Sequence, residues 1–382
     1  MVVGTAADVV LMVSLVGRTC CILSIIPFNN AGMAPAPHER STMTSAAPRR
    51  GFVFQTCRLG LLAVGFVAAQ AAHAEKPYKY YAVGDTSDVV LPAPAHPALV
   101  LMGGGPDVDD AFRWMIRKGG GGNFVVIRAT GTEAYNPYVF AMGGVRSVET
   151  IVVPSRAAAS DPFVLQRIRG AEAVFIAGGD QNDYLQFWKG TPLAAALQQL
   201  ASRNVPIGGT SAGLAVLGLF IYSGANQSVT SADALANPYN KNVTLGRDFL
   251  ALPYLTRTIT DSHLDARDRM GRLATFLARV VNDGWTSMAR GVGVDVETAL
   301  LIENGQATRV GVGSVYFLQT VGLPQVCAPK TPLTYQNIGV QRLSGAGTFD
   351  LNNWAGYGST VNYSISAVRG VLQSSQAGGA VY

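Results

Sequence analysis

The sequence predicts an α/β protein in which helices cover both faces of a mostly parallel β-sheet. The segments 98–102, 123–128, 150–153 and 173–177 are short and apolar throughout, which is typical of strands buried on both faces. Segments with helical spacing alternate with them, as in successive strand–helix–strand units. Ligands of such sheets bind beyond the carboxyl ends of the strands, so the turns that follow these strands are where function is expected.

The helices expected between the strands follow from apolar spacing. Over 107–118, the side chains of Phe112, Met115 and Ile116 fall on one side of a helix. Proline suits the first turn of a helix, and Pro192 opens one of the clearest helical patterns. The remaining helices are expected at 138–144, 162–169, 192–203 and 273–281.

The stretch Val205–Phe220 reads VPIGGTSAGLAVLGLF and predicts a buried strand, a sharp turn and an apolar helix from Leu214 onward. Gly209 and Gly213 frame Ser211 as G-x-S-x-G, where small residues allow a strained turn that exposes a hydroxyl group. Ser211 is therefore a candidate nucleophile. A glycine-rich turn with an incidental serine is the alternative interpretation.

Two further glycine-rich turns follow predicted strands. Residues 103–105 lack the G-x-G-x-x-G spacing of a dinucleotide site and are assigned only a structural role. At 178–181, which reads GGDQ, two glycines allow a close approach of a ligand to the backbone, and Gln181 places a polar group at the crevice. Asp180 either lines the same crevice or caps a helix, and the sequence does not decide between the two.

A nucleophilic serine needs a base, and the candidates are few. The chain has four histidines, of which two lie before residue 75. His96 stands in a proline-rich approach to the first strand and is expected at the surface. His263 is therefore the candidate base for Ser211, with a histidine in a charged, solvated helix start as the alternative.

The residues that follow His263 are unusually polar. They include three arginines: Arg267, Arg269 and Arg272. Guanidinium groups match carboxylates two hydrogen bonds at a time, so they are candidates for a clamp on a substrate carboxylate. Ion pairs with Asp265 and Asp268 along one helix face are equally expected. A triad acid after the histidine fits the order of the chain, and Asp295 and Glu297 are the candidates.

The rest of the chain is predicted as a loop-rich insertion, 221–253, and a series of strands. Two strands at 291–302 and 307–317 are joined by a turn at Asn304-Gly305. Residues 75–327 are expected to form the main domain. Residues 328–382 are expected to form a β-rich C-terminal extension of short strands on a sheet edge.

Residues 1–74 read as a leader, with a signal peptide at about 43–74. Arginines at 49, 50 and 58 precede an apolar segment that is too short to span a membrane, and an A-x-A site predicts cleavage after Ala74. The part before Met43 is interpreted as a mis-assigned start. A periplasmic or secreted protein, free of the membrane in its mature form, is expected.

Removal of the leader changes what the charge implies. The formal net charge of +5 falls to +2, because the leader contains five arginines and two acidic residues. This small charge gives no case for nucleic-acid binding. Cys327 would be the one cysteine left, so no internal disulfide is expected, and no cysteine or histidine cluster indicates zinc.

Residues from about 98 to 318 resemble cyanophycinase and its relatives among the serine peptidases of family S51. The motifs that carry the resemblance are Gly178–Gln181, Gly208–Gly213, Asp261–His263, Arg267, Arg269, Gly271–Leu273 and Val292–Leu300. The resemblance implies a flavodoxin-like core related to the class I glutamine amidotransferases, with serine where those enzymes have cysteine.

The resemblance also implies roles for individual residues. Ser211 would be the nucleophile and His263 the base. Independently of the resemblance, the N–H of Ala212 at the start of the helix and a backbone donor near Gly179-Asp180 are expected to hold the oxyanion. The substrate site would be lined by Gln181, Asp261, Arg267, Arg269 and Arg272. The reaction implied is hydrolysis of β-aspartyl-arginine links in the storage polymer cyanophycin, without a metal or other cofactor.

Two positions depart from the family pattern. Ser262 stands where cyanophycinases commonly have glutamine, and Val296 aligns with their triad glutamate. Because neighbours in a strand point to opposite faces, Glu297 can replace that glutamate only if a bulge presents it; otherwise the triad is incomplete. The alternatives are an aspartyl or isoaspartyl dipeptidase acting on short peptides, and a non-catalytic peptide-binding relative. A homodimer is one possible assembly.

Overall fold

The structure is a computed structural model that describes residues 75–382. The predicted leader and its cleavage site lie outside the described residues. Within the described part of the chain, no helix is both long and apolar enough to cross a membrane.

One part of the sheet consists of five parallel strands in the order β4-β3-β5-β6-β2. Their bounds are Ala98–Met102 for β2, Asn123–Arg128 for β3, Ser147–Val152 for β4, Ala173–Ile176 for β5 and Ile207–Thr210 for β6. The order of β3 to β6 is that of the first four strands of a flavodoxin-like sheet. β2 comes first in the chain but takes the fifth place, beside β6. The predicted α/β fold with a parallel core is confirmed.

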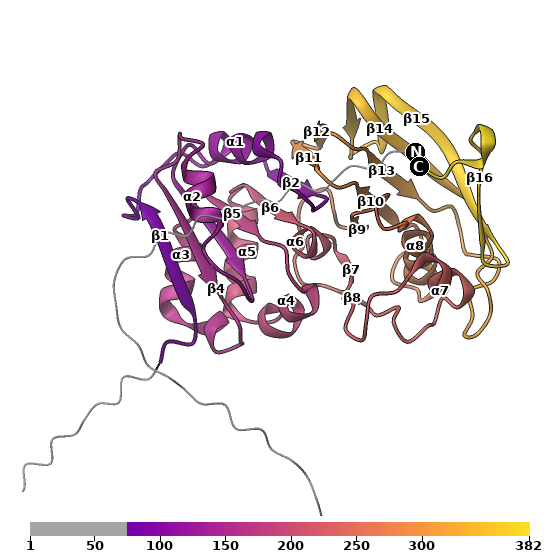
Figure 1. Ribbon diagram of the computed structural model, residues 1–382, viewed down its shortest axis with the longest axis horizontal. Coiled ribbons are helices and arrows are strands. Elements are labelled where there is room, and N and C mark those ends of the chain that lie inside the picture. Colours follow the sequence, from indigo (N-terminus) through magenta and orange to yellow (C-terminus); the bar gives the residue numbers. More distant parts are fainter. Residues whose placement is uncertain (1–74) are drawn as a thin grey trace, which may run out of the picture. The chain divides into compact units, whose positions relative to one another are not determined.

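Helices cover both faces of these strands (Figure 1). One face carries α1 (Asp109–Lys118) and α2 (Tyr135–Phe140), and the other carries α3 (Pro162–Arg169), α4 (Gln181–Trp188) and α5 (Pro192–Ser202). Alternate residues of β2 belong to the two layers: Val100 is in the cluster with Phe112 of α1, and Leu101 is in the cluster with Leu197 of α5. The apolar strands of the sequence are thus buried on both faces, as predicted.

The sheet continues beyond β2 with mostly antiparallel strands. From β2 the order is β11 (Thr298–Glu303), β12 (Gln306–Gly311), β14 (Tyr335–Asp350), β13 (Val315–Gln319), β10 (Arg290–Val294), β9 (Thr258–Ser262), β7 (Phe220–Tyr222) and β8 (Leu245–Arg247). Two helices, α7 (Ser231–Ala236) and α8 (Met270–Asn282), pack against this part.

Each of the two strands expected at 291–302 and 307–317 is divided. β10 ends at Val294 and β11 begins at Thr298. β10 pairs with β9, whereas β11 pairs with β2, so the chain changes its partner strand between residues 294 and 298. Asp295 holds this corner, because its carboxylate accepts the backbone N–H of Asp265 at 3.2 Å and that of Ser314 at 2.9 Å. The local strand pattern did not reveal this change of partner.

The apolar helix expected from Leu214 to Phe220 is also wrong. The structure has only one helical turn there, α6 (Ala212–Ala215), and Phe220 already pairs with Ile259 of β9. A Cβ atom added to Gly218 would lie 2.6 Å from the carbonyl oxygen of Thr258. The second half of this run therefore lies against the backbone of a strand, and sheet pairing replaces the helix.

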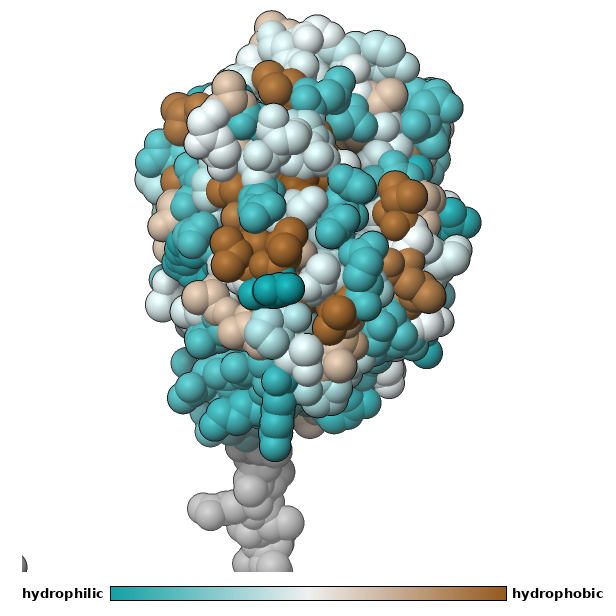
Figure 2. Space-filling view, turned by 90° about the vertical axis from the view of Figure 1, so that its right-hand side faces the viewer, coloured by the Kyte–Doolittle hydropathy of each residue, from teal (hydrophilic) through white to brown (hydrophobic). Residues whose placement is uncertain are grey.

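The two ends of the described chain contain strands of unexpected position or length. Near the start of the described chain, β1 (Lys79–Gly84), for which the sequence predicted no strand, pairs with the edge of β4. The C-terminal strands β14 and β15 (Ala355–Val368) are long rather than short, and β14 lies between β12 and β13; β16 (Val371–Ser374) follows β15. Figure 2 shows this end of the molecule, where exposed apolar side chains lie in small groups among hydrophilic ones.

Candidate active site

Ser211 occupies the strained turn between β6 and α6. Its backbone has φ 52° and ψ −111°, a conformation that residues with a side chain rarely adopt. A Cβ atom on Gly209 would lie 2.5 Å from the carbonyl carbon of Gly213, and one on Gly213 would collide with the carbonyl of Ile176. Both flanking glycines are thus required by close backbone approach, which is the physical basis of the G-x-S-x-G pattern.

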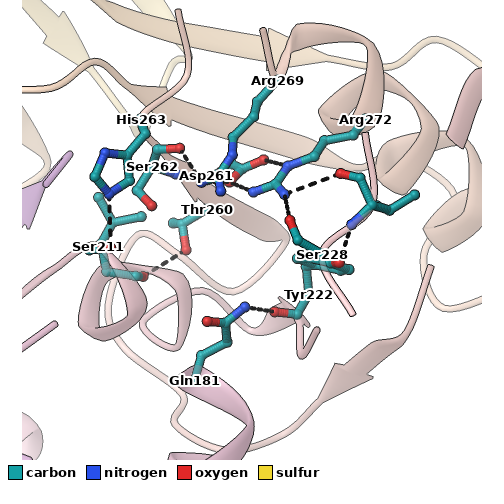
Figure 3. Close-up of polar contacts among 12 residues, drawn as sticks. Gln181, Ser211, Tyr222, Ser228, Thr260, Asp261, Ser262, His263, Arg269 and Arg272 are labelled. Atoms are coloured by element: carbon teal, nitrogen blue, oxygen red, sulfur yellow. Dashed lines mark hydrogen bonds and ion pairs between the residues drawn. The ribbon is translucent and has the colours of Figure 1, made fainter. Parts of the chain in front are cut away.

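His263 follows β9, and its Nε2 atom lies 2.9 Å from Oγ of Ser211 (Figure 3). The imidazole is 7% exposed. Burial, together with the charges of Arg267 and Arg269, lowers the pKa of His263 from 6.5 to about 4. The ring is therefore neutral at pH 7. With its proton on Nδ1, Nε2 can accept the proton of the serine hydroxyl.

The third member of a triad is not present at the imidazole. Within residues 75–382, no side chain accepts a hydrogen bond from Nδ1 of His263, and Glu297 makes no side-chain hydrogen bond. Glu297 lies in the corner between β10 and β11 at φ 51° rather than in a bulged strand. Asp295 bonds to two backbone N–H groups and not to the imidazole. The expected acid Glu297 therefore lacks geometric support.

A cavity of about 430 Å³ opens beside Ser211. Its walls come from the start of α4, the segment 222–228, the end of β9 and the turn that precedes α8. Gln181 lies in this wall as expected, and its amide donates a hydrogen bond of 3.4 Å to the carbonyl of Tyr222 (Figure 3). His96, by contrast, is exposed, as the sequence predicts.

Arg272 is held by Asp261 rather than left free for a ligand. Nε and Nη2 of Arg272 donate to the two carboxylate oxygens at 2.8 and 2.5 Å, and both side chains are almost fully buried. The guanidinium also lies 5.0 Å from the centre of the Tyr222 ring. Paired charges of this kind fix geometry, because either group alone would be costly in the interior.

The segment that carries Arg267 and Arg269 is not helical, contrary to the helix face considered for ion pairs with Asp265 and Asp268. Residues 263–269 form turns, in which the N–H of Arg269 bonds to the carbonyl of Leu264 at 2.8 Å, and α8 begins only at Met270. Arg269 donates to the carbonyl of Ser262 at 2.7 Å and lies 3.6 Å from Asp261.

Arg267 differs from the other two arginines because its side chain is exposed at the cavity. Among the described residues, it makes no ion pair. The alternative pairing of these arginines with Asp265 and Asp268 is likewise not seen in that part of the chain: Asp268 instead accepts a hydrogen bond from Tyr382 at 2.9 Å. Of the three arginines, Arg267 is the one open to a ligand.

The predicted oxyanion donors lie around the serine. Ala212 is the first residue of α6, so its N–H has no acceptor within the helix. A Cβ atom on Gly178 would lie 3.6 Å from Cβ of Ser211, which places the 178–180 loop, and with it Gly179, beside the nucleophile. The carboxylate of Asp180 caps α4 by accepting the N–H of Asn182 at 2.8 Å. Only its backbone is therefore a candidate for the oxyanion site.

Sequence reasoning missed one wall of the cavity. Tyr222 and the residues 226–228 belong to the loop-rich insertion, to which the sequence assigned no role, and they line the cavity beside Arg272. Nothing in their residue types indicates a site; only the pairing of β7 with β9 brings them there. Within residues 75–382, no three His, Cys, Asp or Glu side chains are grouped to hold a metal ion.

The sequence is similar to known peptidases. The profile of peptidase family S51 matches residues 139–310. The chain is 26% identical over 219 residues to cyanophycinase from Trichormus variabilis, with 56% of this chain and 68% of that protein aligned. It is 31% identical over 181 residues to cyanophycinase from Synechococcus elongatus, with 46% and 51% aligned. A solved peptidase from an acI-B1 Actinobacterium covers 68% of this chain and 98% of its own, with a TM-score of 0.45 and 16% identity.

Proposed function

The chain belongs to peptidase family S51 and is a serine-type peptidase, and we propose that it hydrolyses aspartyl or β-aspartyl peptide bonds with Ser211 as nucleophile and His263 as base. The observation that carries this proposal is the 2.9 Å separation of Oγ and Nε2 at the mouth of a polar cavity of about 430 Å³. Nucleophile and base within hydrogen-bonding distance are the first requirement of covalent hydrolysis.

The reaction begins when Ser211 Oγ attacks the carbonyl carbon of the scissile amide while Nε2 of His263 takes the hydroxyl proton. The oxyanion of the tetrahedral intermediate accepts the N–H of Ala212 and a backbone N–H of Gly179 or Asp180. The imidazolium returns its proton to the departing amine, which leaves an acyl-enzyme on Ser211. Water then gives up a proton to the imidazole, attacks the ester and releases the acid, and the serine recovers its proton.

A peptide with a free carboxylate fits the charge of the cavity. Arginines at 267, 269 and 272 face two carboxylates, Asp180 and Asp261, so the lining has an excess positive charge. Because Arg269 and Arg272 are engaged with Asp261, Arg267 would meet the substrate carboxylate directly. The β-aspartyl-arginine link of cyanophycin, the polymer after which the similar cyanophycinases are named, contains such a carboxylate.

Two further candidate functions use the same site. An aspartyl or isoaspartyl dipeptidase would take short peptides, and a binding relative would hold an aspartyl peptide without cleaving it. The free Nδ1 of His263 is the observation in favour of the binding relative.

We also propose that the protein acts outside the cytoplasm, from the signal-peptide pattern of the sequence. N-terminal sequencing of the exported protein would find Glu75 first if cleavage follows Ala74, and an intact leader would contradict it.

The test is incubation of the protein with cyanophycin, with β-aspartyl-arginine and with α-aspartyl dipeptides, followed by mass analysis of the products. Release of β-aspartyl-arginine from the polymer supports a cyanophycinase, and cleavage of dipeptides alone supports the dipeptidase. Ser211→Ala should lower the rate by about 10³-fold or more. Tight binding of an aspartyl peptide, with no turnover and no labelling of Ser211 by a serine-directed phosphonate, would favour the binding relative.

A further inference from the structure

The turn Gly103–Gly105, which ends β2, lies against the catalytic pair. A Cβ atom built on Gly104 would come 2.5 Å from Cε1 of His263 and 3.1 Å from Cβ of Ser211, and it would collide with Nε2. Nε2 is the atom that faces the serine hydroxyl. The only side chain that Gly104 can carry without moving the imidazole is therefore a hydrogen atom.

Three consecutive carbonyl groups, those of the last residue of β2 and the first two residues of this turn, bind three separate segments of the site. The carbonyl of Met102 accepts the N–H of Ser211 at 3.1 Å, that of Gly103 accepts the N–H of His263 at 2.8 Å, and that of Gly104 accepts the N–H of Glu297 at 2.9 Å. In a regular strand successive carbonyls point to opposite sides. The φ angle of 88° at Gly104 turns the peptide planes so that three partners are reached in succession.

The three partners share one unusual property. Ser211, His263 and Glu297 have φ angles of 52°, 49° and 51°, all in the left-handed region that residues with a side chain avoid. Such conformations persist where the surroundings fix them. Here each one donates its backbone N–H to a carbonyl group of the segment Met102–Gly104, so this segment restrains the backbone of both the nucleophile and the base.

From this geometry we infer that Gly104 is a positioning residue of the peptidase reaction: it sets the place of the His263 ring against Ser211 by leaving space that a methyl group would fill. The inference rests on the proposed function for its effect on turnover, but the steric coupling of positions 104 and 263 does not depend on turnover. A displacement of about 1 Å between reacting groups is enough to lower a rate by about 10²-fold.

The variant that tests this is Gly104→Ala, with Gly284→Ala as the matched control. Gly284 also has a positive φ, 72°, but a Cβ atom there meets nothing within 4 Å, so the control reproduces the backbone strain without the collision. Phosphonate labelling of Ser211 and peptide hydrolysis should fall by about 10²-fold or more in Gly104→Ala and by less than twofold in the control. Equal rates in the two variants would overturn the inference.

Folding of the variant is tested by removing the imidazole. In the His263→Ala background the collision is absent, so Gly104→Ala should lower the melting temperature by less than half as much as it does in the wild-type background, whereas Gly284→Ala should cause the same decrease in both. If Gly104→Ala does not fold alone but folds with His263→Ala, the inference is supported. If Gly104→Ala lowers the melting temperature equally in both backgrounds, the inference fails, even where the protein hydrolyses peptides. If the coupling is found and no peptide is hydrolysed, the proposed function fails and the steric relationship stands.

Discussion

Asp261 holds the guanidinium of Arg272 through both carboxylate oxygens, at 2.5 and 2.8 Å, in the wall of the cavity beside Ser211. The pair joins the end of β9 to the first turn of α8. His263 follows β9 directly, so the strand that carries the base is tied to the helix behind the substrate site. This relationship makes Asp261 a structural residue as well as a lining residue.

Asp261→Asn should destabilise the fold strongly. The substitution leaves the buried charge of Arg272 without its partner, which typically costs about 3–5 kcal/mol in the free energy of unfolding. Chemical denaturation at pH 7 measures this decrease in the free energy of unfolding. The control is Asp85→Asn, which breaks the exposed pair with Arg146 and should lower the free energy of unfolding far less, because water screens that pair. Similar losses in the two variants would show that the buried pair is not essential.

The activity should persist to unusually low pH. Because the pKa of His263 is lowered to about 4, the imidazole stays a neutral base down to that value, and kcat/KM should fall on the acid side with a midpoint near 4 instead of near 6.5. The pH profile of peptide hydrolysis measures this midpoint. Arg267→Gln removes a positive charge that lowers the pKa, so it should move the midpoint upward. A wild-type midpoint at 6.5 or above would contradict the buried, neutral ring.

Asp295 should make stability depend on pH in the opposite direction to His263. Burial and the neighbouring charge of Asp265 raise the pKa of Asp295 from 3.8 to about 7, so its contribution to stability is present below pH 3.8 and is lost as the pH rises toward 7. The lowered pKa of His263 acts in the other direction: stability rises as the pH increases from about 4 to 6.5, and falls again as the pH is lowered through this range.

Asp265→Asn isolates this effect, because it removes the charge beside Asp295 and leaves the backbone N–H that bonds to it. As the pH rises from 4 to 7, the change in melting temperature should be more positive or less negative in this variant than in wild type, since the contribution of His263 is common to both. Asp110→Asn, an exposed substitution in α1, serves as the control and should follow the wild-type curve. An Asp265→Asn curve that coincides with wild type would show that the two carboxylates do not interact.

Glu297→Gln should have little effect on turnover. The side chain makes no hydrogen bond within residues 75–382, so removal of its charge should lower kcat/KM by less than tenfold, with KM unchanged. The comparison of Glu297→Gln with wild type on the same peptide tests this. A loss of about 10³-fold or more would instead identify Glu297 as the acid of a triad that forms with substrate.

Much of the parallel core could be predicted from the sequence because its strands are buried on both faces. Strands and helices such as 98–102, 123–128 and 162–169 occur where the sequence predicts them, since a continuous apolar run or a helical stripe is a local property. The same logic failed from Leu214 to Phe220, where an apolar run that suits a helix becomes one helical turn and a strand. The partner strand β9 lies far along the chain, so the local sequence pattern cannot predict the pairing with it.

By itself the sequence determined the parallel α/β core, the serine at a strained turn after a strand, and a choice of histidine made nearly unique by scarcity. It did not determine the partners of those residues. Tertiary structure alone decided that Asp261 neutralises Arg272, that Glu297 does not reach the imidazole, and that the adjacent carbonyls of Met102 and Gly103 bind the backbones of Ser211 and His263. The physical reason is that residue type and spacing fix short-range conformation and burial, whereas a hydrogen bond between distant segments depends on which strands pair and where each one ends.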